Sequence, residues 1–317
     1  MKILLVGDVH CVPSEIEECN SLMEKILSIK GYDAICFMGD QYNNHDAMSV
    51  RVMNFWHNWF SKLKNCFVIV GNHDQSGAGL EEVHSMRAHS DQVVVVDKPT
   101  EICSGTWAVP YYDTEEKFRA ATRELKGMLL CHATFDGAAY DNGFYAPDGF
   151  SLDSVAQFDG VISGHIHTPQ SFSNVTYIGA PRWRTLSDAN IDRHLWLYDF
   201  EKQEVVEKIP TDDACRRIWK FSDLPNEPVD LSGVSEKDDV RVDIFGKPEH
   251  VEEREKILRA QGVRTRRFPD KKSRVSVKES DGIPEAFSGF VEAFSPPNGT
   301  SKEILKKEIG KRVYETP

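Results

Sequence analysis

Met1-Lys2-Ile3-Leu4-Leu5-Val6-Gly7-Asp8-Val9-His10 opens the chain with an apolar run that leads directly into two side chains able to bind metal. Residues 3–6 predict a buried strand, because they are all apolar and run into a Gly-Asp pair. The arrangement recurs where residues 34–38 lead into Gly39-Asp40 and residues 67–70 lead into Gly71-Asn72-His73-Asp74. Side chains that can carry chemistry therefore follow three predicted strands in succession.

Helix-like stretches separate these predicted strands. Residues 13–30 place Leu22, Ile26 and Ile29 on one face, and residues 47–63 predict a second helix. Strands that alternate with helices indicate an α/β core. Ligands of open α/β sheets collect at the carboxyl ends of the strands, so side chains from distant parts of the chain are expected to converge there.

The chain changes character along its length, which predicts three parts. Shorter strand-like runs continue to about residue 200, and the residues after 212 are more charged. We expect an α/β domain over residues 1–210, a small α+β domain over 211–280 and C-terminal helices over 281–317. The last part carries an apolar stripe at helical spacing, formed by Ile283, Phe287, Phe290 and Phe294. Such a stripe packs either on its own domain or on a partner.

The composition excludes some classes of protein. No run of about 18 apolar residues exists, so no membrane span is expected. The seven cysteines follow no Cys-x-x-Cys pattern, which is typical of free thiols in a reducing compartment, and we expect a cytoplasmic protein. The net charge of −12 argues against wrapping nucleic acid unaided.

One short stretch is nevertheless basic, and a nucleic-acid substrate therefore stays possible. It contains Arg264, Arg266, Arg267, Lys271, Lys272, Arg274 and Lys278. The stretch is either a solvated loop or edge strand, or a patch that contacts phosphates.

The candidate metal ligands form an ordered series. They are Asp8, His10, Asp40, Asn72, His132, His165 and His167. Mixed oxygen and nitrogen donors without thiolate suit Mn²⁺, Mg²⁺, Fe or Zn²⁺ better than a structural zinc site. A carboxylate such as Asp40 has two oxygens and can bridge two cations. A pair of cations about 3.5–4 Å apart is the usual device for in-line displacement at phosphorus, so the series predicts phosphoester hydrolysis.

His73 is set apart from the ligands because it directly follows Asn72. Its position suits a proton donor to the leaving oxygen, or a cation that stabilises the transition state. Asp74 comes next and is expected to fix the tautomer of His73. The remaining histidines lack such framing, although His45 is close enough to Asp40 in sequence to line the same cleft.

These motifs, in this order, resemble those of the calcineurin-like metallophosphoesterase superfamily. The resemblance implies a four-layer αββα sandwich, with two mixed sheets between helices, and a binuclear metal centre. It assigns one metal to Asp8, His10, Asp40 and His167, and the other to Asp40, Asn72, His132 and His165. His73 would be the catalytic acid.

Finer features resemble the SbcD-type nuclease subunits of DNA repair and recombination, including those of tailed phages. The segments that carry this likeness are Val109-Pro110-Tyr111-Tyr112 and the run from Gly164 to Arg182. The resemblance implies a capping domain over 211–280 that positions DNA, a homodimer, and terminal helices that dock on an SbcC-like SMC-type ATPase. Gly179-Ala180 replaces the usual Gly-Ser, and Gln41-Tyr42-Asn43-Asn44 follows Asp40 in an uncommon pattern, which leaves substrate preference open.

The leading hypothesis is a Mn²⁺-dependent DNA exo- or endonuclease subunit that acts with that ATPase. Arg182, Arg184 and Arg266 would contact backbone phosphates. The alternative is a small-molecule phosphodiesterase that acts on cyclic nucleotides or related esters, for which the same metal centre would serve. The residues after 210 favour the nuclease, because a compact small-molecule enzyme does not need them. A binding protein with a vestigial site is a third hypothesis, which the complete ligand set disfavours.

Overall fold

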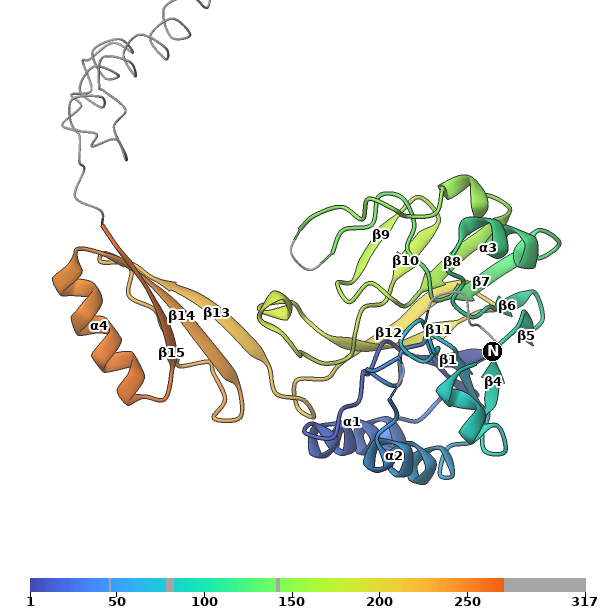
Figure 1. Cartoon of the computed structure of the whole chain (residues 1–317), viewed down its shortest axis with the longest axis horizontal. Coiled ribbons are helices and arrows are strands. Elements are labelled where there is room, and N and C mark those ends of the chain that lie inside the picture. Colours follow the sequence, from blue (N-terminus) through green and yellow to red (C-terminus); the bar gives the residue numbers. More distant parts are fainter. Residues whose placement is uncertain (46, 78–82, 141–142, 271–317) are drawn as a thin grey trace, which may run out of the picture. The chain divides into compact units, whose positions relative to one another are not determined.

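The computed structural model describes residues 1–45, 47–77, 83–140 and 143–270. Its first sheet has the strand order β12-β11-β1-β2-β3-β4 (Figure 1). The strands are β1 (Lys2–Val6), β2 (Ala34–Phe37), β3 (Cys66–Ile69), β4 (Val94–Val96), β11 (His194–Asp199) and β12 (Glu204–Pro210). β1 to β4 run parallel, and β11 and β12 pair antiparallel beside β1. The sheet is therefore mixed, as predicted.

The second sheet has the order β5-β6-β7-β8-β10-β9. Its strands are β5 (Thr100–Cys103), β6 (Thr106–Ala108), β7 (Gly127–Cys131), β8 (Phe158–Ser163), β9 (Gln170–Phe172) and β10 (Val175–Tyr177). The inner strands are parallel, and β5 and β9 are antiparallel edges. Three single-turn helices lie in the connections, at Ser85–His89, Leu152–Ser154 and Leu186–Asp188.

Three apolar cores separate four layers. α1 (Ile16–Ser28) and α2 (Val50–Phe60) pack on the first sheet through residues such as Leu4, and α3 (Glu115–Thr122) packs on the second sheet through residues such as Leu129. Ile3 and Leu5 point the other way, into a core shared by the two sheets. Side chains alternate between the faces of a strand, so a strand buried on both faces is apolar throughout, as β1 is. The predicted four-layer sandwich is confirmed.

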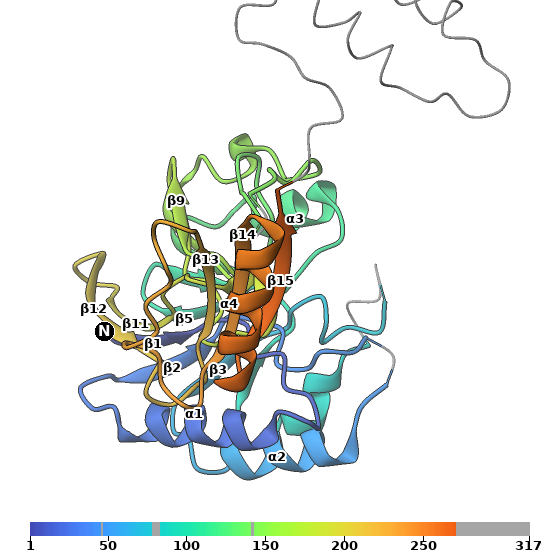
Figure 2. The same cartoon turned by 90° about the vertical axis from the view of Figure 1, so that its left-hand side faces the viewer.

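α1 and α2 lie along the same face of the first sheet (Figure 2). Their apolar stripes provide this contact: Leu22, Met23 and Ile26 of α1 and Trp56 and Phe60 of α2 are buried. The expected helices over 13–30 and 47–63 are thus present in shortened form. No helix in the described part of the chain is long and apolar enough to cross a membrane.

A third, three-stranded sheet follows, with the order β13-β14-β15. Its elements are β13 (Ile218–Asp223), β14 (Asp239–Gly246), α4 (Pro248–Ala260) and β15 (Arg264–Pro269). The chain divides into two compact units, one of Met1–Phe221 with Val229–Val242, the other of Ser222–Pro228 with the residues from Asp243 onward. β12, the last strand of the sandwich, ends at residue 210, whereas the first unit continues to Phe221 and also includes Val229–Val242. The predicted segment 281–317 lies outside the described residues.

Candidate metal centre

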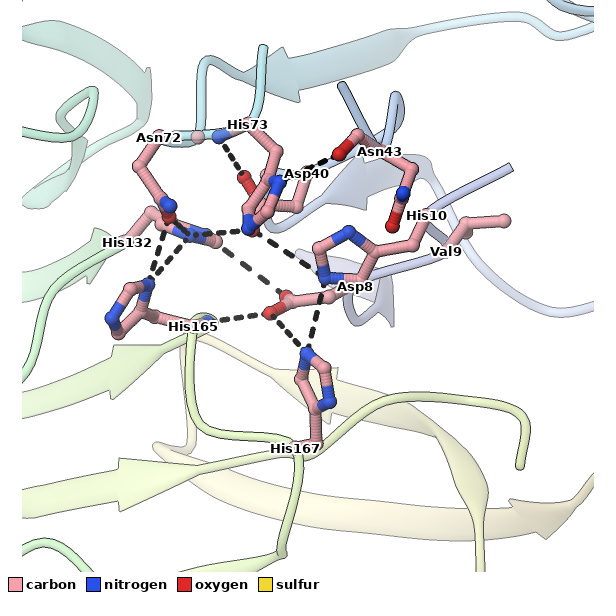
Figure 3. Close-up of polar contacts among 12 residues, drawn as sticks. Asp8, Val9, His10, Asp40, Asn43, Asn72, His73, His132, His165 and His167 are labelled. Atoms are coloured by element: carbon pink, nitrogen blue, oxygen red, sulfur yellow. Dashed lines mark hydrogen bonds and ion pairs between the residues drawn. The ribbon is translucent and has the colours of Figure 1, made fainter. Parts of the chain in front are cut away.

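Five strands from the two sandwich sheets end at the candidate ligands (Figure 3). β1 is followed by Asp8 and His10, β2 by Asp40, β3 by Asn72, β7 by His132, and β8 by His165 and His167. All seven predicted ligands are thus brought to one place, although the first and the last are 159 positions apart in sequence. Their convergence follows from parallel strands that all end at the same edge.

Tight backbone turns aim these side chains. His10, Asp40 and His165 have φ of +49°, +55° and +76°, in the left-handed region. Glycine is required directly before Asp40 and directly before Asn72, because a side chain at either position would collide with a neighbouring ligand residue. A Cβ on Gly39, which has φ +112°, would lie 2.2 Å from Nδ1 of His132, and one on Gly71 would lie 2.2 Å from Oδ1 of Asp40.

The first group of ligand atoms comes from Asp8, His10 and His167. Nε2 of His10 and Nε2 of His167 face each other at 3.1 Å, and Oδ2 of Asp8 is 3.8 Å from Nε2 of His167. Oδ2 of Asp8 also accepts a hydrogen bond from the backbone N–H of His165 at 2.8 Å. The three side chains can therefore direct one donor atom each at a common cation.

The second group comes from Asn72, His132 and His165. Oδ1 of Asn72 is 2.9 Å from Nε2 of His132 and 2.9 Å from Nδ1 of His165. Nδ1 of His132 donates to the carbonyl oxygen of Met38 at 2.8 Å, which fixes the tautomer and leaves Nε2 as the coordinating atom. These three donor atoms again converge on one point.

Asp40 stands between the two groups. Its Oδ2 is 3.5 Å from Nε2 of His10 in the first group and 3.3 Å from Nε2 of His132 in the second. Its Oδ1 accepts the backbone N–H of His73 at 2.8 Å, which holds the carboxylate in place. Burial raises the pKa of Asp40, but the charges of His132, His10 and His73 outweigh burial and hold that pKa below its ordinary value. The Asp40 carboxylate is therefore within reach of both groups of candidate ligands.

The charges and burial of the candidate ligands fit two divalent cations. Burial raises the pKa of Asp8 to about 7, and Oδ1 of Asp8 has no hydrogen-bond partner among the described residues. Burial lowers the pKa of His165 to about 3 and that of His10 well below its ordinary value, so both imidazoles are neutral and able to coordinate. A buried carboxylate oxygen without a hydrogen bond is stabilised by nearby positive charge, which His132 supplies only at 4.0 Å. This donor set fits two divalent cations.

His73 lies beside the ligands, with its ring 4.8 Å from that of His10. Nδ1 of His73 donates to the carbonyl oxygen of Asn43 at 2.8 Å, which leaves Nε2 to exchange a proton with a substrate. The ring of His45 stacks on that of His73 at 4.4 Å, and Nδ1 of His45 donates to the carbonyl oxygen of Asn72. The carbonyl oxygen of Asn43 and the ring of His45 thus hold the His73 ring in place.

The prediction that Asp74 fixes the tautomer of His73 is wrong. The carboxylate of Asp74 is buried and accepts the backbone N–H groups of Tyr42 and Gly71, both at 3.0 Å. It therefore closes the turn that carries Asn72 and His73, while the carbonyl oxygen of Asn43 takes the role expected of Asp74.

The three predicted phosphate-binding arginines have different surroundings. Arg182 is 1% exposed; it donates to the carbonyl oxygens of Val9 and His10 and pairs with Glu15. It cannot reach a substrate, so its prediction as a substrate-binding residue is wrong. Arg266, on β15 in the second unit, makes a two-point contact with Asp243.

Arg184 is the arginine that faces the metal centre. It lines a pocket of about 440 Å³ whose walls are His10, Asp40, Asn43, His73, Tyr140, His165, His167, Arg184 and Ser187. Tyr140 and Ser187 were not predicted as site residues, and neither was Asn43, because a backbone carbonyl or a lone hydroxyl carries no sequence signal. The pocket presents four candidate ligands and one arginine to a single space, which suits an anionic substrate.

Comparisons with known proteins agree with this chemistry. A family model described as calcineurin-like phosphoesterase matches residues 1–169, which include all seven candidate ligands and His73. The chain is also 27% identical, over 243 residues, to exonuclease subunit 1 of Enterobacteria phage T4, a match that covers 68% of this chain and 70% of that protein. The chain therefore belongs to the calcineurin-like phosphoesterase family and is a metal-dependent phosphoesterase.

Proposed function

We propose that this phosphoesterase is a nuclease subunit that hydrolyses phosphodiester bonds of DNA. The observation that supports it best is the extent of the similarity to the phage exonuclease subunit: 243 residues, against 169 for the family model. The likeness therefore continues beyond the part of the chain that the family shares for general phosphoester chemistry.

The candidate ligands would hold two cations. Asp8, His10 and His167 would hold one cation, Asn72, His132 and His165 the other, and Asp40 both. Bound there, two divalent cations would neutralise charge on the phosphate oxygens and make a water more acidic. We expect Mn²⁺, with Mg²⁺, Fe or Zn²⁺ as alternatives for the same mixed donor set.

His73 would act on the leaving oxygen. Its Nδ1–H is taken by the carbonyl oxygen of Asn43, so Nε2 carries the transferable proton. Arg184, on the wall of the same pocket, would bind a phosphate oxygen of the strand and so hold the scissile bond in line.

Partners remain part of this proposal. The relative is named a subunit, which supports an assembly with a second protein. We propose that the partner is an SbcC-like SMC-type ATPase, bound by residues 281–317, that the nuclease is a homodimer, and that the unit containing α4 positions DNA. The ATPase would then supply DNA affinity that a chain with a net charge of −12 lacks.

A second candidate function is hydrolysis of small phosphodiesters. The pocket volume of about 440 Å³ is in the range of small-molecule sites, which favours this candidate.

One assay separates the two. The full chain is supplied with Mn²⁺ and given linear DNA or bis-p-nitrophenyl phosphate, with and without an SbcC-like ATPase. The Asp40→Asn variant should lose both activities, and the matched control His57→Asn, a surface helix position, should keep them. DNA cleavage by the wild type supports the nuclease. Turnover of the small ester without DNA cleavage under any condition would favour the second candidate.

A further inference from the structure

A hairpin inserted between β7 and β8 borders the metal pocket. Its two arms are joined by backbone hydrogen bonds from Tyr140 N–H to the carbonyl oxygen of Phe144 and from Ala146 N–H to that of Ala138. An isolated bridge pairs Ala139 with Tyr145. These contacts give the arms a defined register, so neighbouring side chains point to known sides.

The hairpin is tied to the strand that leaves the metal centre. Gln170, the first residue of β9, accepts the backbone N–H of Ala139 at 2.8 Å and donates to the carbonyl oxygen of Ala139 at 2.7 Å. Gln170 follows the ligand His167 by three positions. In Figure 1 the green segment between β7 and β8 passes beside β9. The hairpin is therefore held at a fixed place next to the ligands.

In the hairpin, small side chains are buried and large aromatic side chains are exposed, which is the reverse of what burial of apolar surface favours. The small residues Ala138 and Ala146 are buried, while Tyr140, Phe144 and Tyr145 are 40%, 73% and 74% exposed. Burial of an aromatic side chain stabilises a fold, so aromatic rings kept at the surface point to a role other than stability. Tyr140 lines the metal pocket, so this aromatic surface begins where a scissile phosphate must bind.

The Ala139–Tyr145 pair lies on one face of the hairpin, and the next positions, Tyr140 and Phe144, lie on the other. We propose that Tyr140 and Phe144 form a stacking platform for unpaired nucleobases of the strand whose phosphate occupies the metal centre. This inference rests on the proposed nuclease function and names its substrate form: single-stranded DNA, or a frayed end. Bases present flat aromatic faces only when they are unpaired, and stacking on aromatic side chains is tolerant of sequence. A duplex hides those faces, so the platform disfavours intact duplex and accepts any base.

The test compares Phe144→Leu with the wild type in the full chain with Mn²⁺. Phe144→Trp is the conservative variant, because it keeps an aromatic face. Tyr145→Leu is the matched control, because it removes an equally exposed ring from the opposite face of the hairpin. Each protein is given oligothymidylate, an oligonucleotide of the same length with abasic residues beside the cleavage point, and a blunt duplex. Binding is followed in parallel by fluorescence anisotropy of the labelled oligothymidylate.

Phe144→Leu should raise the KM for oligothymidylate about 5- to 100-fold, in keeping with the loss of one base–aromatic stack. The KM of this variant for the abasic strand should change little, and Phe144→Trp and Tyr145→Leu should match the wild type. Equal losses on normal and abasic strands, or no loss on either, would overturn the platform while leaving the nuclease intact. A wild type that cleaves the blunt duplex but neither cleaves nor binds oligothymidylate would overturn the platform alone. A wild type that cleaves none of the three substrates would overturn the nuclease proposal as well.

Discussion

Replacement of Arg182 by methionine tests the reassignment of this side chain from substrate contact to internal support. Arg182 Nε donates to the carbonyl oxygen of Val9 at 2.7 Å, and Nη2 donates to that of His10 at 2.9 Å and to Glu15 at 2.8 Å. Methionine keeps similar bulk but leaves two buried carbonyls and a half-buried carboxylate without this donor. Loss of one partner of a buried ion pair costs about 3–5 kcal/mol.

We expect the free energy of unfolding of Arg182→Met to fall by about 3–5 kcal/mol, a large part of the 5–15 kcal/mol typical of a domain. Urea unfolding followed by circular dichroism measures this change. Because Arg182 holds the backbone of the ligand His10, Mn²⁺ affinity should also fall, by about 10- to 100-fold, in a titration of folded protein. Arg184→Met, in the pocket wall, is the matched control; it should raise KM while unfolding changes by about 1 kcal/mol or less.

The double variant Arg182→Met/Glu15→Gln separates the ion pair from the carbonyl contacts. Glu15 keeps its 3.5 Å contact with Arg184 in Arg182→Met but loses its closest partner. If the pair with Arg182 matters, removal of the Glu15 charge should recover part of the loss, with a coupling of about 0.5–3 kcal/mol. A stable Arg182→Met protein with normal Mn²⁺ affinity and a raised KM for DNA would refute the reasoning and restore Arg182 as a phosphate contact.

Three further predictions concern the site and its support. His73→Asn should lower kcat about 10²- to 10⁴-fold with two metals still bound per chain, measured by elemental analysis beside initial rates; unchanged turnover would exclude proton transfer by His73. Removal of metal with a chelator should abolish hydrolysis and lower the melting temperature, and added Mn²⁺ should restore both in proportion to its concentration; a melting temperature indifferent to Mn²⁺ would contradict the site. Burial raises the pKa of Asp188, but Arg193 and the backbone N–H groups of Thr185 and Arg184 outweigh it, so the pKa is lowered on folding. Asp188 thus contributes stability that is complete above its unfolded pKa of about 3.9 and is lost as pH falls through the lower folded pKa. The difference in free energy of unfolding between the wild type and Asp188→Asn, measured in urea, should therefore be smaller at about pH 3 than at about pH 6. A difference that stays constant with pH would be inconsistent with this linkage.

The sandwich was predictable where apolar pattern and burial coincide. Strands buried on both faces, such as β1 and β2, appear in the sequence as short apolar runs, and the stripes of α1 and α2 have helical period. α3 was missed, because it spans Glu115–Thr122 with only Phe118 and Thr122 buried and offers no stripe. β12 was missed for a similar reason. It is an edge strand with an exposed surface, so no core imposes an apolar pattern on it.

The candidate ligands could be located from sequence because strand ends dictate where they lie. The direction of a side chain beyond a turn could not be predicted, which is why Asp74 was assigned to His73 when its carboxylate turns back to Gly71. Arg182 was misjudged because charge alone does not reveal burial. Its partners are mostly backbone carbonyls, and these are invisible in a list of residue types.

At the left-handed turns of His10, Asp40 and His165, the residue that the metal site needs is less stable in the fold than glycine would be. Glycine adopts this backbone at no steric cost, whereas a residue with a side chain gives up roughly 1 kcal/mol or more at each position. A library selected only for thermal resistance, without metal, should therefore accumulate glycine at these sites and lose catalysis. The same library selected with Mn²⁺ present should retain the two histidines and the aspartate, because bound cations stabilise only a folded chain that carries all of these ligands.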